Sequence, residues 1–184
     1  MAEELNIIHW PDPRLLKVSQ PVTEFTPALR EFAFRMLELM RQAKGVGLAA
    51  PQVGKNIRMF VMNPTGEPGD DRVYVNPVLS DPEADEDAEE GCLSLPNITS
   101  QINRSKAMRM QAQDLEGKSF EQTESGFVAR VWQHEFDHLN GILIIDRMGV
   151  VDKLKYRKTL RELQEKYEEE HPAARQKVKG KRQK

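Results

Sequence analysis

If residues 126–140 form a helix, apolar side chains occupy almost every position on the face that would pack against the rest of the chain. The apolar positions are Phe127, Val128, Val131, Trp132, Phe136 and Leu139. Asn140-Gly141 follows directly and is a typical signal for the end of a helix. A helix with so wide an apolar surface is normally buried. We therefore expect it in the centre of the domain, with the rest of the chain packed around it.

Strand-forming segments dominate the middle of the chain. Their apolar and branched residues are separated by turn residues. These segments are residues 57–62, 73–79, 106–113 and 119–123, with Asp114–Lys118 as a hairpin connection between the last two. Together with the buried helix they predict an α+β fold, in which mixed or antiparallel sheets pack around that helix.

Two further helices are expected. Thr26 followed by Pro27 is a typical helix start, and apolar residues then recur at helical spacing until the helix stops near Gly45. Residues 152–170 have only a thin apolar stripe among charged residues, which predicts a C-terminal helix on the surface. Several prolines before residue 26 predict extended chain and turns there.

The length and charge of the chain set its expected organisation. A chain of 184 residues suits one domain with a sizeable core and is too short for two ordinary ones. We expect a single domain over residues 1–170 and a flexible basic tail over residues 171–184. The tail and an acidic run over residues 81–90 are both more typical of solvated surface than of a binding site.

Composition indicates a globular protein of a reducing compartment. Hydrophobic residues make up 39% and charged residues 30% of the chain, and no stretch approaches the roughly 20 apolar residues of a membrane span. The first residues include Glu3 and Glu4 in place of a basic and apolar targeting signal. The single cysteine, Cys92, excludes an internal disulfide. We expect a cytoplasmic protein with no membrane association.

The buried helix also carries a metal-binding pattern. His134 and His138 are four residues apart, so on a helix both imidazoles lie on one face and can reach one cation. Glu135 lies off that axis, near enough to handle a water molecule at the metal without being a ligand. The pattern predicts a metal site but needs a third ligand.

Cys92 is the candidate third ligand. Gly91 beside it permits an unusual backbone angle, and a thiolate on a metal would explain a lone cysteine. Two nitrogens and one sulfur would leave the fourth tetrahedral position open, which is typical of a catalytic rather than a structural site. A small buried hydrophobic role is the ordinary alternative for a free cysteine.

A glycine-rich segment after the first long helix is the third element. It is expected to form a turn that brings backbone and the amide of Gln52 close to a ligand, where an amide N–H supports a developing oxyanion. The segment reads Gly45-Val46-Gly47-Leu48-Ala49-Ala50-Pro51-Gln52.

Three motifs in this order resemble those of the peptide deformylases. They are Gly45–Gln52, Glu90-Gly91-Cys92-Leu93-Ser94 and Gln133-His134-Glu135-Phe136-Asp137-His138-Leu139. The opening segment His9–Leu15 and the pair Pro21-Val22 also resemble that family. The resemblance extends to about Arg147 and implies a hydrolase that removes the formyl group from the N-terminal formylmethionine of new polypeptides, releasing formate.

The resemblance also implies roles for single residues. Cys92, His134 and His138 would bind a divalent metal, and Glu135 would be the general acid and base. Gln52 and the backbone N–H of Leu93 would form the oxyanion hole. Fe2+ is the ion that the resemblance favours, with Zn2+, Ni2+ or Co2+ able to substitute.

Substrate contacts are expected around an apolar pocket beside the metal. Arg130 and Val131, one turn before His134, should face it, with Val46, Gly47 and Gly91 approaching from the two loops. Backbone groups of the loops could pair with an extended peptide as an added strand. The expected partner is a nascent N-formylmethionyl peptide, and specific DNA binding is not expected.

Two other function classes stay open at this point. A zinc endopeptidase of the His-Glu-x-x-His type would leave Cys92 and Gln52 without a purpose. A ribosome-binding or RNA-binding protein with a structural metal would use the basic tail to contact phosphate. Ribosome contact through the tail is also compatible with the enzyme, as an accessory property.

Overall fold

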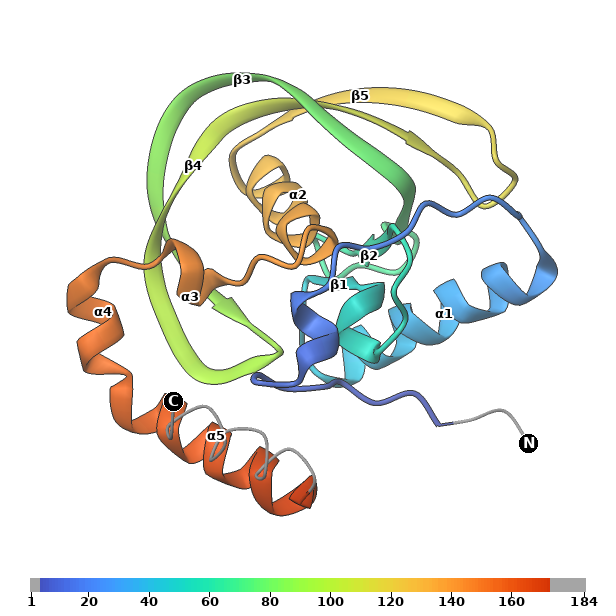
Figure 1. Ribbon diagram of the computed structural model, residues 1–184. Helices are drawn as coiled ribbons and strands as arrows, with labels where there is room; N and C mark the ends of the chain where they lie inside the picture. Colours follow the sequence, from blue (N-terminus) through green and yellow to red (C-terminus); the bar gives the residue numbers. More distant parts are fainter. Residues whose placement is uncertain (1–3, 173–184) are drawn as a thin grey trace.

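The computed structural model describes residues 4–172 (Figure 1). Within that range one antiparallel sheet has the order β1-β2-β3-β4-β5. Its strands are β1 (Gly47–Ala49), β2 (Met59–Met62), β3 (Arg72–Cys92), β4 (Leu95–Gln113) and β5 (Ser119–Ser125). The helices are α1 (Pro27–Gln42), α2 (Gly126–Leu139), α3 (Ile144–Arg147), α4 (Val150–Lys155) and α5 (Arg157–Glu170), with the 3-10 turns η1 (Pro13–Leu16) and η2 (Ala50–Val53). The predicted α+β class with an antiparallel sheet is confirmed.

Strands β3 and β4 are much longer than predicted and curve around α2 (Figure 1). Strand β3 continues through the acidic run, although acidic residues disfavour strands by themselves. Pairing with β4 from Glu83 to Cys92 supplies the backbone hydrogen bonds that outweigh this preference. Register shifts after Val75 and Ser80 bend the pair further. The prediction of short strands was wrong because it could not include this long-range partner.

The β2 residues pack on both faces of the sheet. Phe60 and Met62 join a core cluster with α2, whereas Met59 and Val61 join a second cluster with α1. Side chains alternate between the faces of a strand, so all four are buried. The sheet therefore has a helix packed on each face at this point.

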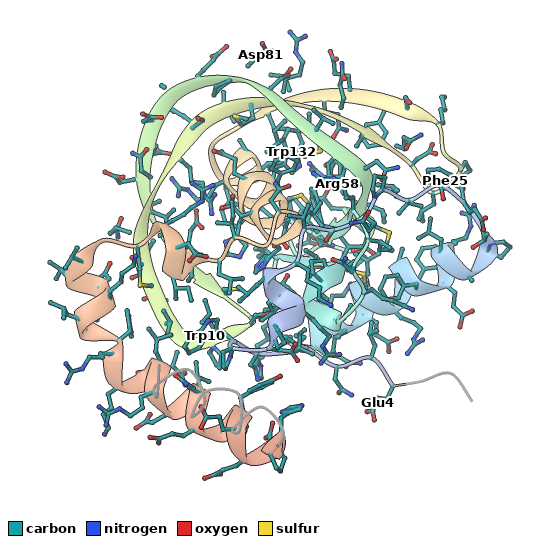
Figure 2. The ribbon with its side chains drawn as sticks, viewed as in Figure 1. Glu4, Trp10, Phe25, Arg58, Asp81 and Trp132 are labelled. Carbon is teal, nitrogen blue, oxygen red and sulfur yellow. The ribbon has the colours of Figure 1, made fainter. Side chains whose placement is uncertain are left out.

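Helix α2 occupies the space enclosed by the curved strands (Figure 1). Trp132 is fully buried there and meets the ring of Tyr74 edge-on, with 5.7 Å between the ring centroids. Figure 2 shows Trp132 inside the molecule and Asp81 at the outer bend of β3. Leu139 ends the helix, and Gly141 follows in the left-handed region as the sequence indicated.

Helix α1 starts where the sequence predicts. Thr26 is the N-cap, and its hydroxyl accepts a hydrogen bond from the backbone N–H of Leu29. Met36 and Met40 lie buried against the sheet. The segment that follows was expected to be a turn, but Gly47–Ala49 pairs with β2 as the edge strand of the sheet.

The C-terminal helical region differs from the single helix expected over residues 152–170. Tyr156 separates α4 from α5, and its hydroxyl accepts a hydrogen bond from the backbone N–H of Thr99 on β4. The prediction of one helix was wrong because this contact turns the chain. Helix α5 has no buried residue, so its surface position is confirmed. Of the tail predicted over residues 171–184, residues 173–184 lie outside the described range.

Among residues 4–172, no helix combines the length and the apolar character needed to cross a bilayer.

Candidate metal centre and active site

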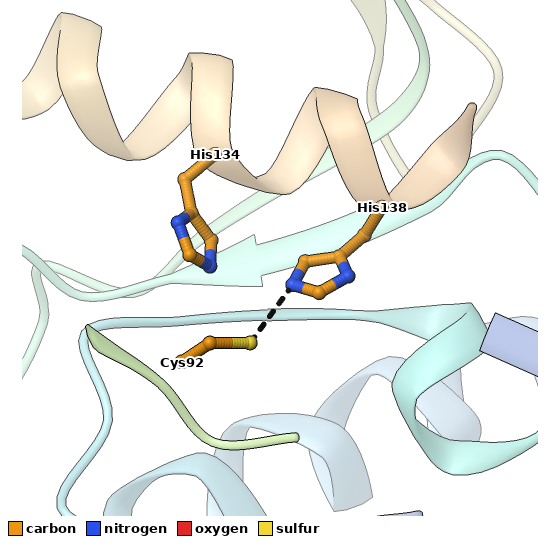
Figure 3. A group of neighbouring side chains, drawn as sticks. All are labelled: Cys92, His134 and His138. Atoms are coloured by element: carbon orange, nitrogen blue, oxygen red, sulfur yellow. Dashed lines mark hydrogen bonds between the residues drawn. The ribbon is translucent and has the colours of Figure 1, made fainter. Parts of the chain in front are cut away.

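Cys92, His134 and His138 lie together although they come from two elements. Cys92 is the last residue of β3, and the two histidines are one turn apart on α2. One ligand atom from each lies within 4.8 Å of the others, and Sγ of Cys92 is 3.3 Å from Nε2 of His138 (Figure 3). Ligand atoms around one tetrahedral cation would be roughly 3–4 Å apart. The donor set and spacing fit a divalent metal after a small movement.

The two imidazoles differ in their surroundings. Nδ1 of His134 is 3.0 Å from Oε2 of Glu90, which leaves Nε2 free to bind an ion. His138 is almost fully buried, and its Nδ1 has no hydrogen-bond partner among the described residues. Burial, together with the nearby His134, lowers the pKa of His138 well below its usual value. A lowered pKa favours the neutral imidazole, which is the form that binds a metal.

Glu90 is a residue of the site that the sequence interpretation missed. It was included in the acidic run, whose residues 81–90 were expected on the surface; residues 81–87 and Glu89 are exposed but Glu90 is buried. Burial works to raise the pKa of Glu90, but hydrogen bonds from Arg104 and His134 outweigh it and hold the pKa well below its usual range. Its position within the cysteine motif, two residues before Cys92, was the available signal.

A buried charge network continues from Glu90 behind α2. Arg104 donates from Nε and Nη2 to the two oxygens of Glu90, at 2.9 Å each, and from Nη1 to Asp137 at 2.6 Å. Arg147 of α3 bonds the same carboxylate of Asp137. Asp137 lies between the two histidines in sequence, so the network braces the helix that carries them.

Glu135 lies at the base of the site with one oxygen unused. The residue is 3% exposed, and its Oε2 has no hydrogen-bond partner among the described residues. Burial raises the pKa of Glu135 to about 7. A carboxyl group with such a pKa can take up and release a proton near neutral pH.

Gln52 is held in one orientation by its own backbone segment. Its Oε1 accepts a hydrogen bond from the backbone N–H of Ala49 at 2.8 Å. The amide nitrogen therefore points the other way, toward Oγ of Ser94 at 3.2 Å and Sγ of Cys92 at 3.6 Å. This places an N–H donor beside the cysteine. Ser94 belongs to the cysteine motif, but the sequence interpretation assigned it no role.

A cavity of about 480 Å³ opens onto these residues. All site residues predicted from the sequence except the deeper His138 line it: Val46, Gly47, Gln52, Gly91, Cys92, Leu93, Arg130, Val131, His134 and Glu135. Ile98 and the exposed Phe127 add apolar surface that the sequence interpretation did not assign. The guanidinium of Arg130 is directed to Glu90 instead of the cavity.

Comparisons with known proteins agree with this geometry. The family model of polypeptide deformylases matches residues 4–154. A peptide deformylase of Rhodopirellula baltica is 47% identical over 147 residues, covering 79% of this chain and 73% of that protein. One from Thermotoga petrophila is 47% identical over 154 residues, covering 83% and 92%. The crystal structure of a plant peptide deformylase is 36% identical with a TM-score of 0.89, over 94% of this chain and 95% of that chain. In sequence and in fold, this chain belongs to the peptide deformylase family.

Proposed function

We propose that this peptide deformylase removes the formyl group with a metal ion held by Cys92, His134 and His138. The observation that carries the proposal is the convergence of these three ligand atoms within 4.8 Å, beside a cavity that Glu135 also lines. Helix α2, with its buried His-Glu-x-x-His motif, is in this proposal the central element of the catalytic domain, residues 1–170.

A divalent ion at these residues would polarise the formyl oxygen and lower the pKa of a water molecule toward about 7. The chemistry of the donor set supports such a site, because a thiolate and two neutral imidazoles leave one tetrahedral position for a small ligand. The hydrogen bond from His134 to Glu90 fixes which nitrogen of that ring faces the ion.

Glu135 is the general acid and base of the proposed reaction. Its unpartnered Oε2 takes the proton of the attacking water as the C–O bond to the formyl carbon forms. The same carboxyl group then gives this proton to the amine as the C–N bond breaks. Formate and a peptide with a free amino terminus are released.

Gln52 and Leu93 form the proposed oxyanion hole. The amide of Gln52 is already oriented by Ala49, so it can donate to the oxygen that becomes negative without first reorganising. Leu93, whose backbone N–H is the second donor, is the first residue of the turn between β3 and β4 and directly follows Cys92. Both donors line the same cavity as Glu135.

The substrate contacts are also part of the proposal. Val46, Gly47, Gly91 and Val131 line the cavity and would surround the methionine side chain and its backbone. Strand β1 is at the edge of the sheet, so an extended peptide could pair with it as a further strand. Such pairing is tolerant of sequence beyond the first residue.

One assay tests the ligand set and the reaction together. Anaerobically prepared protein should release formate from formyl-Met-Ala-Ser, and metal analysis of that sample should give about one divalent ion per chain. Cys92→Ala should lose both the ion and the activity. A Cys92→Ala protein that kept a full equivalent of metal would refute the ligand set and favour the endopeptidase alternative.

Fe2+ is the proposed ion, with Zn2+, Ni2+ or Co2+ as substitutes. An iron–thiolate site is sensitive to oxidation, so activity should be lost in air and spared when nickel replaces iron. A zinc form that is fully active and stable in air would argue against iron.

Location and partners complete the proposal. A cysteine that must stay reduced suits the cytoplasm, where nascent N-formylmethionyl chains would be the substrates. Deleting residues after Glu170 should weaken co-sedimentation with ribosomes at low salt and leave turnover of a small formyl peptide intact. Unchanged co-sedimentation would remove the ribosome contact from the proposal.

A further inference from the structure

Two residues of α2 hold opposite oxygens of one buried carboxylate. Nη1 of Arg130 donates to Oε1 of Glu90 at 2.8 Å, and Nδ1 of His134 is 3.0 Å from Oε2. Arg130 and His134 are four residues apart, so they lie on the same face of the helix. Glu90 belongs to β3 and is two residues from Cys92. Its carboxylate therefore joins the helix of the two histidines to the strand of the cysteine.

Arg130 contacts the two long strands at three points. Besides Glu90, its Nη1 donates to the backbone oxygen of Ile102 on β4 at 2.9 Å, and its Nη2 donates to that of Glu86 on β3 at 2.6 Å. The side chain is 9% exposed. A guanidinium fixed by three acceptors has little freedom, and charge-assisted hydrogen bonds of this kind are stronger than neutral ones.

The same residue also lines the cavity. The guanidinium is occupied by Glu90 and the two carbonyl groups, so a bound side chain would meet the methylene groups of Arg130. Arg130 therefore has two separate parts, whereas the sequence-based prediction placed the whole residue in the substrate pocket. The stem can shape the pocket while the guanidinium acts on Glu90.

We propose that Arg130 is a positioning residue, which through Glu90 holds the Cys92 strand and the His134 helix at the separation that metal binding requires. The inference rests on the ligand set proposed above. Arg104 also binds Glu90, but it comes from β4 and reaches α2 only through a second carboxylate, that of Asp137. Among the residues that form the described hydrogen bonds of Glu90, only Arg130 and His134 belong to α2, which carries two of the three proposed ligands.

Arg130→Met separates the two roles, because methionine keeps an unbranched apolar stem and has no donor. Loss of an outer contact of a metal ligand typically costs about tenfold to a hundredfold in affinity or activity. We expect Co2+ to leave the cobalt-loaded variant about tenfold to a hundredfold faster than wild type when a chelator is added, with a changed visible absorption spectrum of the cobalt. kcat should fall by a similar factor, whereas KM for formyl-Met-Ala-Ser and the preference for formyl-methionine over formyl-norleucine should stay near wild type.

The opposite pattern would overturn the proposal. A raised KM or a changed side-chain preference, with cobalt release and spectrum as in wild type, would leave Arg130 with a pocket role alone. Arg109→Met is the matched control, since Arg109 also pairs with two acidic residues but is half-exposed and does not line the cavity. It should leave all of these quantities unchanged.

A double-mutant cycle tests the route through Glu90. If Arg130 acts through that carboxylate, Arg130→Met should add little to the effect of Glu90→Gln on cobalt release. Independent, multiplicative effects would contradict the inference.

Should Arg130→Met fail to fold, Arg130→Lys replaces it, because lysine keeps the charge but cannot reach all three acceptors at once. A wild-type protein that takes up no cobalt, or takes it up without a thiolate absorption band, would refute the ligand set itself.

Discussion

A methyl group on the α-carbon of Gly47 would lie 2.3 Å from Oε1 of Glu135, far inside van der Waals contact. Gly47 belongs to β1 and has no positive φ, so glycine is needed here for space and not for backbone conformation. The edge strand therefore lies directly against the carboxyl group that is the proposed general acid and base. Glu135 keeps its place because the strand beside it has no side chain at this position.

Gly47→Ala should displace Glu135 and reduce kcat by about a hundredfold, since a misplacement of about 1 Å at a reacting group has an effect of that order. Steady-state turnover of formyl-Met-Ala-Ser, together with metal analysis, checks this. Gly149→Ala is the control, because a methyl group on Gly149 would meet no atom within 4 Å. If Gly47→Ala had wild-type turnover, β1 would have moved to accommodate the methyl group without displacing Glu135.

Glu135→Gln should lower kcat by about a hundredfold to ten-thousandfold while the metal stays bound. The amide is similar in size but cannot accept and return the proton. Turnover and metal content should be measured on the same sample. If the variant lost its ion as well, Glu135 would have a part in metal binding that the proposed mechanism does not give it.

Gln52→Ala should lower kcat by about a hundredfold to a thousandfold, which is the usual effect of losing one oxyanion donor. The ion should remain, because Gln52 is a neighbour and not a member of the proposed ligand set. Gln164→Ala on α5 removes a surface amide and serves as the control. An unchanged kcat for Gln52→Ala would exclude the oxyanion role.

Asp12→Asn should reduce stability at neutral pH and have little effect in acid. Burial works to raise the pKa of Asp12, but the hydrogen bonds and charge of Arg14 outweigh it and lower the pKa below its usual value. A lowered folded-state pKa contributes stability above the unfolded value of about 4, and this contribution is lost as the pH falls below it.

Urea unfolding of both proteins between pH 7 and pH 3 measures this effect. The difference in free energy of unfolding should be largest near neutrality and shrink below about pH 4. Asparagine can still accept the hydrogen bond from the backbone N–H of Arg14 but loses the charge and the bond from Nη2 of Arg14, so the comparison measures the whole ion pair. If the difference in free energy of unfolding did not change with pH, the effect of the substitution would come from packing.

Local pattern was enough to predict several elements. The start of α1 at Thr26, the hairpin that joins β4 and β5, and the bounds of α2 follow from capping residues, turn residues and helical spacing, which act within a few residues of chain. The same is true of the pairing of His134 with His138, because a helix brings residues four apart to one face. The residues also made Cys92 the candidate third ligand and the Gln52 amide a candidate oxyanion donor, and the resemblance to the peptide deformylases implies the same roles.

Other features depend on partners distant in sequence. The acidic run becomes a strand only because β4 pairs with it, and Glu90 is buried only because Arg104, Arg130 and His134 surround its carboxylate. Tyr156 interrupts the C-terminal helix because Thr99 lies within reach of its hydroxyl. The sequence by itself determined where α1 and α2 form and which residues are of a type that can bind a metal, since both depend on residue type and local spacing. Only the tertiary structure decided which charges are buried and where the guanidinium of Arg130 points, since these depend on long-range contacts that compensate the cost of desolvation.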